Sequence, residues 1–418
     1  MFTAVALKYK IYFLVFAAIV IVQGLYLAIV QPPLQWFDSA VYDAEAWNFV
    51  QGLGLSYTPG IPDALREPGY SVLLLAPIYS IFGHSLLAVQ IVQVVLSAVT
   101  GVIIVIIAQR FIGRTAVGVI AALLFGFYPG VVVASGEILT ETFFAFLIII
   151  FTWCWLEALQ RRSVQLLMLG GFILGLTTLT RFVALLFPVV VVIVIWWLWR
   201  DSKRTLIGLA GFGLLFMVPL APWFARNYIV LDHFIMGRTG GGEIYWTGSY
   251  IPWDGDWQGY LWPLSEYQAA TPNMFDHDAA MTQRALENIT ADPIGVAGIW
   301  IKKPLKIFFQ PEGLQFLIHA GAFTPSQLLL SALVIIAFCG HLLLLTLAAL
   351  GVLRWKQARL FFIVTGSLLL YMVVIHLPLN GVPRYAVPFY SLIFIASAIG
   401  LLELLNDVKT HLKTHVKR

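Results

Sequence analysis

The fold is decided by residues 86–134, whose sequence is LLAVQIVQVVLSAVTGVIIVIIA (86–108), QRFIGR (109–114) and TAVGVIAALLFGFYPGVVVA (115–134). Each outer run holds roughly 20 uncharged and mainly apolar residues, which as a helix span the ~30 Å hydrocarbon core of a bilayer. The short gap between them carries two arginines. Two long apolar runs with a short basic connection are typical of two transmembrane helices joined in the cytoplasm.

The same pattern recurs along the chain, in which 60% of the residues are hydrophobic and 11% are charged. It predicts an all-α polytopic membrane protein, a single membrane domain over residues 1–418 with about ten transmembrane helices. The predicted spans are 11–30, 86–108, 115–134, 141–159, 165–180, 182–199, 205–225, 327–351, 360–378 and 386–404. Residues 68–82 are too few to cross, because a 15-residue helix is only about 22 Å long. We expect them to lie in the outer interface.

Basic and acidic residues are predicted to lie on opposite sides of the membrane. The lysines and arginines of the short gaps, with Lys8, Lys10 and the basic C-terminal tail, define a cytoplasmic side that holds both termini. Most carboxylates then fall into two long extracytoplasmic loops, 31–85 and 226–326. The predicted location is the plasma (inner) membrane, with the chemistry on the extracytoplasmic or periplasmic face.

Short helices are expected within both loops. In the first, residues 39–51 alternate as an amphipathic helix. In the second, we expect helices over 279–290 and 294–309, the latter with Lys302, Lys303 and Lys306 facing lipid headgroups. No soluble domain is expected beyond these loops.

Several classes of function lack support in the sequence. Cys154 and Cys339 both fall inside predicted spans, so neither a disulfide nor a cysteine metal site is indicated. No soluble basic domain could carry nucleic acid. The pairs Asp254/Asp256 and Asp276/Asp278 are of a kind that could hold Mg or Mn through oxygen. Acidic pairs in loops are usually just solvated, so no metal site is predicted.

Three carboxylates are candidates for chemistry. Asp38 directly follows the first span, where a carboxylate could accept a proton from an attacking hydroxyl. It could equally cap the helix that begins there. Glu137 and Glu141 lie in a tight turn between two spans, with a spacing that can place both on one helical face. They too could be solvated turn residues, although carboxylates this close to a membrane are more often functional.

Four arginines break the positive-inside trend by lying at the outer ends of apolar segments: Arg66, Arg181, Arg226 and Arg384. Each one alone is explained by snorkelling or by pairing with a carboxylate. Four at one interface favour the binding of an anionic headgroup, because the planar, permanently charged guanidinium suits phosphate oxygens.

The chain resembles the polytopic GT-C glycosyltransferases, specifically the bacterial relatives of protein O-mannosyltransferases and aminoarabinose transferases. The matching elements are collinear and run through most of the chain: Asp38 and Tyr42; Ala46 to Gly54; Arg66, Pro68 and Tyr70; the 129–141 turn; Leu179-Thr180-Arg181; Ala221 to Tyr228 with Arg226 and Asn227; Gly240-Gly241-Gly242; and Pro383-Arg384-Tyr385-Ala386-Val387-Pro388. Several members place a second acid beside the first, whereas Ser39 follows Asp38 here.

The resemblance implies an inverting transfer of a sugar from a polyprenyl-phosphate carrier to a lipid, glycan or protein acceptor. Asp38 and Glu141 would be catalytic. The resemblance places the other members of the set in substrate binding: Tyr42, Arg66, Tyr70, Glu137, Arg181, Arg226, Asn227, Arg384 and Tyr385. The implied partners are the polyprenyl-phosphate-linked sugar, the acceptor and the lipid bilayer; no cofactor is firmly implied, and a divalent cation (Mg or Mn) is left open. A ligase or polymerase of polyprenyl-diphosphate-linked glycans and a flippase of lipid-linked sugars remain as alternatives.

Overall fold

The computed structural model describes residues 2–34, 37–199, 202–258, 262–271, 273–313, 326–355 and 358–416. This part of the chain is helical and contains no strand, so the predicted all-α polytopic class is confirmed. The long helices are α1 (Phe2–Val30), α5 (Leu86–Ile107, continued by η2, Ala108–Ile112), α6 (Thr115–Phe127), α7 (Pro129–Gly136), α8 (Glu141–Arg161), α9 (Val164–Thr180), α10 (Phe187–Trp199, preceded by η3, Phe182–Ala184), α11 (Ser202–Leu231), α17 (Gln327–Arg354), α18 (Arg359–His376) and α19 (Tyr390–Val416, preceded by η6, Pro383–Phe389).

Every predicted span coincides with one of these elements. Among the described residues, eight helices are long and apolar enough to cross a membrane, and the α6–α7 pair would make nine. The remaining predicted span is α9, whose 17 residues give a helix of about 26 Å. The last helix differs most from its predicted bounds, since α19 continues beyond residue 404 to Val416.

The predicted span 115–134 is broken. Helices α6 and α7 meet at an angle of 57° around Tyr128, which has an extended backbone (φ −64°, ψ 127°). The cause is Pro129, because a proline ring disfavours the helical conformation of the residue before it. After the break, α7 packs against α1 and α5 and leads into the Glu137–Glu141 turn.

Small residues let the long helices pack closely. A Cβ atom at Gly171 or Gly175 of α9 would lie 2.3 or 2.4 Å from a backbone carbonyl oxygen of α11. Gly351 of α17 and Gly400 of α19 are similarly close to the facing backbone. Such contacts are common between membrane helices, where close backbone approach supplies much of the packing energy.

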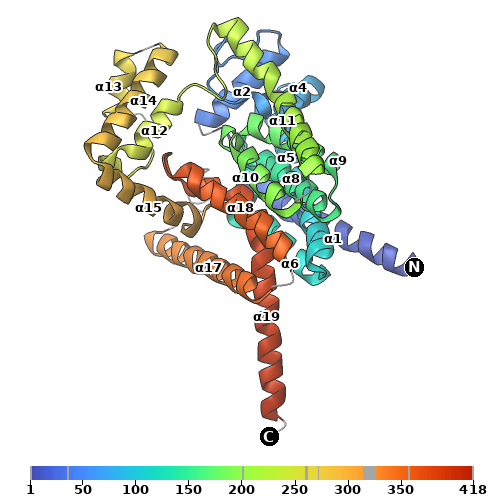
Figure 1. The fold of residues 1–418 in the computed structure, drawn as a ribbon. Helices are drawn as coiled ribbons and strands as arrows, with labels where there is room; N and C mark the ends of the chain where they lie inside the picture. Colours follow the sequence, from blue (N-terminus) through green and yellow to red (C-terminus); the bar gives the residue numbers. More distant parts are fainter. Residues whose placement is uncertain are drawn as a thin grey trace.

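Two groups of shorter helices lie toward one end of the long ones (Figure 1). The first, which we name the inner cap, contains α2 (Phe37–Val50) and the continuous helix formed by α3 (Pro68–Tyr70), η1 (Ser71–Leu75) and α4 (Ala76–Phe82). The latter has the bounds predicted for the interfacial helix. Gly69 lets this continuous helix pack against the C-terminal end of α9, since a Cβ at residue 69 would lie 2.5 Å from the backbone of Leu179 and Thr180.

The second group, the outer cap, stands to one side of the bundle in Figure 1. It contains α12 (Gly241–Ser249), η4 (Ile251–Trp253), α13 (Leu264–Ala270), α14 (Met274–Ala291) and α15 (Pro293–Phe309). The predicted helices 279–290 and 294–309 are α14 and α15, whereas α12 and α13 were not predicted. Part of the predicted 226–326 loop, residues 314–325, lies outside the described residues.

The expectation that the three lysines of α15 face headgroups is wrong for two of them. Lys303 is 1% exposed, and its Nζ donates to the carbonyl oxygens of Gly248 and Leu377, at 2.6 and 2.8 Å, and of Leu379. Lys306 pairs with Asp254 and Asp256, both at 2.9 Å. Lys303 therefore joins the outer cap to the segment before η6.

Candidate active site

Asp38 lies in the first turn of α2 and joins two arginines that are far apart in sequence. Its Oδ1 accepts a hydrogen bond from Arg66 Nη2 at 2.5 Å, and its Oδ2 accepts one from Arg384 Nη2 at 2.6 Å. Burial works against ionisation of Asp38, but Arg384 and Arg66 outweigh it and hold the pKa of the carboxyl well below its usual range. The Asp38 side chain is still 26% exposed, so the bridge is within reach of a ligand.

Glu141 begins α8 and forms the second acidic position of the site. Its Oε1 lies 3.2 Å from Arg181 Nη2 and 3.8 Å from Arg384 Nε. Arg384 consequently stands between the two predicted catalytic carboxylates, Asp38 and Glu141. The structure brings together four of the predicted residues, Asp38, Arg66, Glu141 and Arg384, with Arg181 beside them.

Two glutamines of α5 hold the turn that leads to Glu141. Gln90 Nε2 donates to the carbonyl oxygens of Pro32 and Gly136, at 3.0 and 2.9 Å, and Gln93 Nε2 donates to those of Ser135 and Glu137, at 3.2 and 2.7 Å. Because these polar side chains lie at the end of an apolar helix, they satisfy backbone groups that water does not reach. The side chain of Glu137 is 1% exposed and lies within this buried turn.

The three tyrosines predicted for substrate binding lie near the arginines and near the turn before Glu141. Tyr385 lies beneath Arg181, with 5.3 Å between guanidinium carbon and ring centroid. Tyr42 and Tyr70 pack edge to face at 5.2 Å, both buried, and Tyr70 donates to Gln93 Oε1 at 2.8 Å. Tyr385 therefore contacts an arginine of the cluster, whereas Tyr70 contacts Gln93, which holds the turn.

Arg226 and Asn227 have a different placement. Arg226 Nη1 donates to the carbonyl oxygen of Asp63 at 2.7 Å, and Nη2 donates to that of Leu55 at 2.9 Å. Asn227 is fully buried, and its Nδ2 donates to the carbonyl oxygen of Ile235 at 3.0 Å. Both side chains fasten loops instead of meeting the Asp38–Arg384 cluster.

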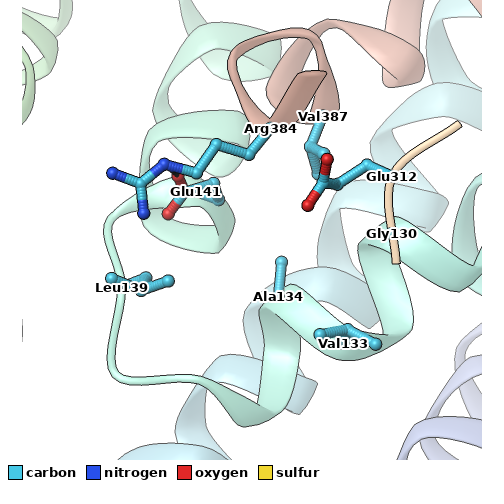
Figure 2. A pocket seen from close by; sticks show the side chains of 8 residues that line it. All are labelled: Gly130, Val133, Ala134, Leu139, Glu141, Glu312, Arg384 and Val387. Carbon is cyan, nitrogen blue, oxygen red and sulfur yellow. Dashed lines mark ion pairs between the residues drawn. The ribbon is translucent and has the colours of Figure 1, made fainter. Parts of the chain in front are cut away.

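Two residues near this cluster were not singled out from the sequence. Arg238 approaches Asp38 because Thr239 N donates to the carbonyl oxygen of Ala64 at 2.8 Å, which sets the chain beside Arg66. Glu312 lines a small cavity together with Glu141 and Arg384 (Figure 2). The only local signal for Arg238 was its position just before the three glycines, and Glu312 stands in a stretch with no recognisable motif.

No cluster of three or more histidine, cysteine, aspartate or glutamate side chains suited to a metal occurs among the described residues. Of the acidic pairs considered from the sequence, Asp254 and Asp256 are engaged by Lys302 and Lys306. Asp278 accepts a hydrogen bond from Gly242 N at 2.7 Å.

Comparisons with known proteins agree with this architecture. The family model of dolichyl-phosphate-mannose-protein mannosyltransferases matches residues 67–225. The solved apo structure of the Archaeoglobus fulgidus oligosaccharyltransferase aligns over 98% of this chain with 15% identity and a TM-score of 0.55. This chain covers 52% of that protein, so it spans about half its length. No curated protein matches in sequence.

Two solved structures of Cupriavidus metallidurans ArnT are also similar. The one bound to undecaprenyl phosphate covers 95% of this chain and 77% of its own, with 14% identity and a TM-score of 0.41. The apo form covers 95% and 76%, with 17% identity and a TM-score of 0.36. The family model and the oligosaccharyltransferase fold confirm the GT-C resemblance predicted from the sequence.

Proposed function

We propose that the protein is an inverting glycosyltransferase that moves a sugar from a polyprenyl-monophosphate carrier to an acceptor on the extracytoplasmic face. The observation that carries the proposal is the ion-pair chain Arg66–Asp38–Arg384–Glu141–Arg181. Three guanidinium groups gathered at the outer end of a membrane bundle form a site for phosphate oxygens. The bound ArnT structure, which holds undecaprenyl phosphate, is in keeping with this donor.

Asp38 keeps Arg66 and Arg384 together in the absence of donor. When a phosphate enters, its oxygens compete for the same Nη atoms that Asp38 now holds. During transfer, negative charge grows on the departing polyprenyl phosphate, and arginines already in position stabilise that charge without reorganisation. Arg181, held by Glu141 and Tyr385, is placed to contribute from the other side.

The side of the membrane follows from the distribution of the remaining charges. Arg110 and Arg161 share Glu157, at 2.9 and 2.5 Å, near the end of α8 opposite Glu141, and Arg114 pairs with Glu403 of α19 at 2.7 Å. Basic residues concentrate at cytoplasmic ends. We therefore assign the site to the extracytoplasmic face and both termini to the cytoplasm.

We assign acceptor and sugar specificity to the outer cap. It adjoins the site through Lys303, which holds the segment preceding Arg384. Loops on a rigid scaffold can vary without loss of the fold, and such elements usually carry specificity.

A donor assay tests the proposal. Purified protein in lipid vesicles is offered undecaprenyl-monophosphate and undecaprenyl-diphosphate conjugates of several hexoses and aminopentoses, and both binding and sugar release are measured. We expect binding and release with a monophosphate donor. Arg66→Ala should weaken donor binding at least about tenfold, since one charge-assisted contact to phosphate contributes roughly 1.5–3 kcal/mol.

Two results would contradict the proposal. Binding of diphosphate carriers alone would indicate a ligase or polymerase. Binding of the donor with no sugar release would indicate a flippase. The matched control is Lys409→Ala, an exposed position on the far end of α19, which should leave donor affinity unchanged.

A further inference from the structure

Glu312 has an environment unlike that of the other carboxylates of the site. It lies on the chain just after α15 and lines the cavity bounded by Gly130 and Ala134 of α7, by Glu141 of α8 and by Arg384. Figure 2 shows its carboxylate directed into this cavity, across from Glu141. Within the described part of the chain, no hydrogen bond or ion pair engages the Glu312 side chain.

The position of Glu312 is set by close backbone packing. Its carbonyl oxygen and Cβ would be 3.1 and 3.2 Å from a Cβ atom at Gly130. Gly313, at φ +116°, would with a Cβ come within 2.7 Å of Gly130 N and the Pro129 carbonyl carbon. Two glycines therefore let the segment cross the α6–α7 break at van der Waals distance. A carboxylate presented on so closely packed a backbone has little freedom to leave the cavity.

The neighbouring carboxylates, Asp38 and Glu141, pair with arginines. Both oxygens of Asp38 accept hydrogen bonds from guanidinium groups, and Glu141 Oε1 pairs with Arg181. Glu141 Oε2 is buried and has no hydrogen-bond partner in the described residues, although Glu141 lines the same cavity. A buried acceptor without a donor is costly unless a ligand supplies one.

We propose that the cavity receives the acceptor hydroxyl and that Glu312 is the general base of the transfer, with Glu141 Oε2 accepting a second hydrogen bond from the acceptor. The proposal rests on the proposed glycosyltransferase function. The hydroxyl proton passes to the Glu312 carboxylate while the acceptor oxygen bonds to the anomeric carbon. The bond from that carbon to the phosphate oxygen breaks, and its electron pair leaves with the polyprenyl phosphate.

The electrostatics of the two acids favour Glu312 over Asp38 for this step. Burial raises the pKa of Glu312 to about 7, with Glu141 adding to the rise and Arg384 opposing it. A general base is most effective when its pKa is near the working pH, whereas Asp38, held far below its usual range, is a weak proton acceptor. Among the described residues, the charged and titratable groups near Glu312 are Arg384 on η6, Glu141 on α8, Tyr128 at the α6–α7 break and Tyr390 on α19.

The test is a pH–rate profile of Glu312→Gln. Protein in lipid vesicles receives the undecaprenyl-monophosphate sugar that the wild type turns over, with water as the acceptor, and release of undecaprenyl phosphate is followed from pH 5 to 9. A base must be deprotonated to act, so the wild-type rate should rise with pH through about 7 and then level off. In Glu312→Gln we expect kcat to fall about 100-fold or more, with loss of that rise and with unchanged affinity for undecaprenyl phosphate.

Two further variants serve as controls for Glu312→Gln. Glu312→Asp should restore part of the rate and the pH-dependent rise. Lys409→Gln, an exposed position near the C-terminal end of α19, should behave as wild type. Turnover by Glu312→Gln within about threefold of wild type, with the rise retained, would overturn the role of Glu312 and leave the proposed function standing. Failure of the wild type to release sugar from any monophosphate donor would overturn both.

Discussion

The two caps differ in how they obtain their stability. Buried side chains of the inner cap, such as Tyr70 and Leu75, pack in one cluster with Phe143 and Leu147 of the transmembrane helix α8. The outer cap has a small core of its own, made of Trp246, Trp253, Leu264, Met281 and Ala285. The inner cap is thus part of the bundle, and the outer cap is a module attached to it. Asp38, which must stay aligned with arginines of other segments, lies in the inner cap.

The attachments differ as well. Arg226 and Thr239 fasten the inner cap through the backbone carbonyls of Leu55, Asp63 and Ala64. The outer cap is held largely by Lys303 and by close contact of Gly248 with Pro378, where a Cβ would be 2.2 Å from the carbonyl oxygen. Arg384 follows this junction closely, so this short segment is one connection between the outer cap and the site, and α15 also contacts η6 itself.

The largest effect on activity is expected from the inner cap. Asp38→Asn should lower transfer about 100-fold, because the neutral amide no longer aligns the two arginines that stabilise the leaving phosphate. Affinity for undecaprenyl phosphate should stay the same or increase, since the phosphate no longer competes with a carboxylate. Turnover and binding are measured on the same vesicles, and wild-type turnover by Asp38→Asn would remove Asp38 from the mechanism.

The same variant has a pH signature. The pKa of Asp38 is depressed in the folded protein, so its ion pairs stabilise the fold above the ordinary aspartate pKa of about 4. This stabilisation is lost as pH falls through the depressed folded-state pKa. The Tm difference between wild type and Asp38→Asn should therefore be full at pH 7 and shrink below about pH 4.

An intermediate effect is expected where the outer cap is attached. Lys303→Met keeps the length and apolar stem of the side chain but leaves the carbonyls of Gly248, Leu377 and Leu379 without their donor. We expect transfer to fall about tenfold, because each orphaned carbonyl costs roughly 1–3 kcal/mol and the segment before Arg384 loosens. Limited proteolysis should cut the outer cap faster. The exposed neighbour Lys302 provides the control Lys302→Met. Equal transfer rates and equal proteolysis of the two variants would show that Lys303 does not attach the outer cap to the segment before Arg384.

The smallest effect on donor binding is expected from the core of the outer cap, and a matched pair of variants separates the two regions. Leu75→Ala and Met281→Ala each truncate a fully buried side chain, which costs about 2–5 kcal/mol locally. Leu75→Ala should lower the Tm of the whole bundle. Met281→Ala should expose residues 241–309 to protease while the bundle keeps its Tm and its affinity for undecaprenyl phosphate. A common loss of Tm in both would mean that the caps unfold as one unit with the bundle.

Much of the fold could be predicted from local pattern. Apolar run length located the long helices, and the bounds predicted for the shorter helix over 68–82 are those of the continuous helix α3–η1–α4. Pattern alone missed the break at Tyr128, although Pro129 was a visible signal for it. It also missed α12 and α13, whose short helices carry little periodicity and are stabilised by tertiary burial around Trp246 and Leu264.

The candidate site divides in the same way. Residue type and position at the outer ends of apolar runs were enough to select Asp38, Arg66, Glu141, Arg181 and Arg384. The sequence by itself determined where the long apolar helices lie and which arginines stand at their ends, because these depend on chain-local hydropathy and charge. Partner choice was decided only by the tertiary structure. Arg384 meets Asp38 across 346 residues, Arg226 binds backbone carbonyls, Lys303 is buried, and Glu312 faces the cavity. The reason is that a side chain's partners depend on which distant helices pack around it, and a sequence window of a few turns does not contain that information.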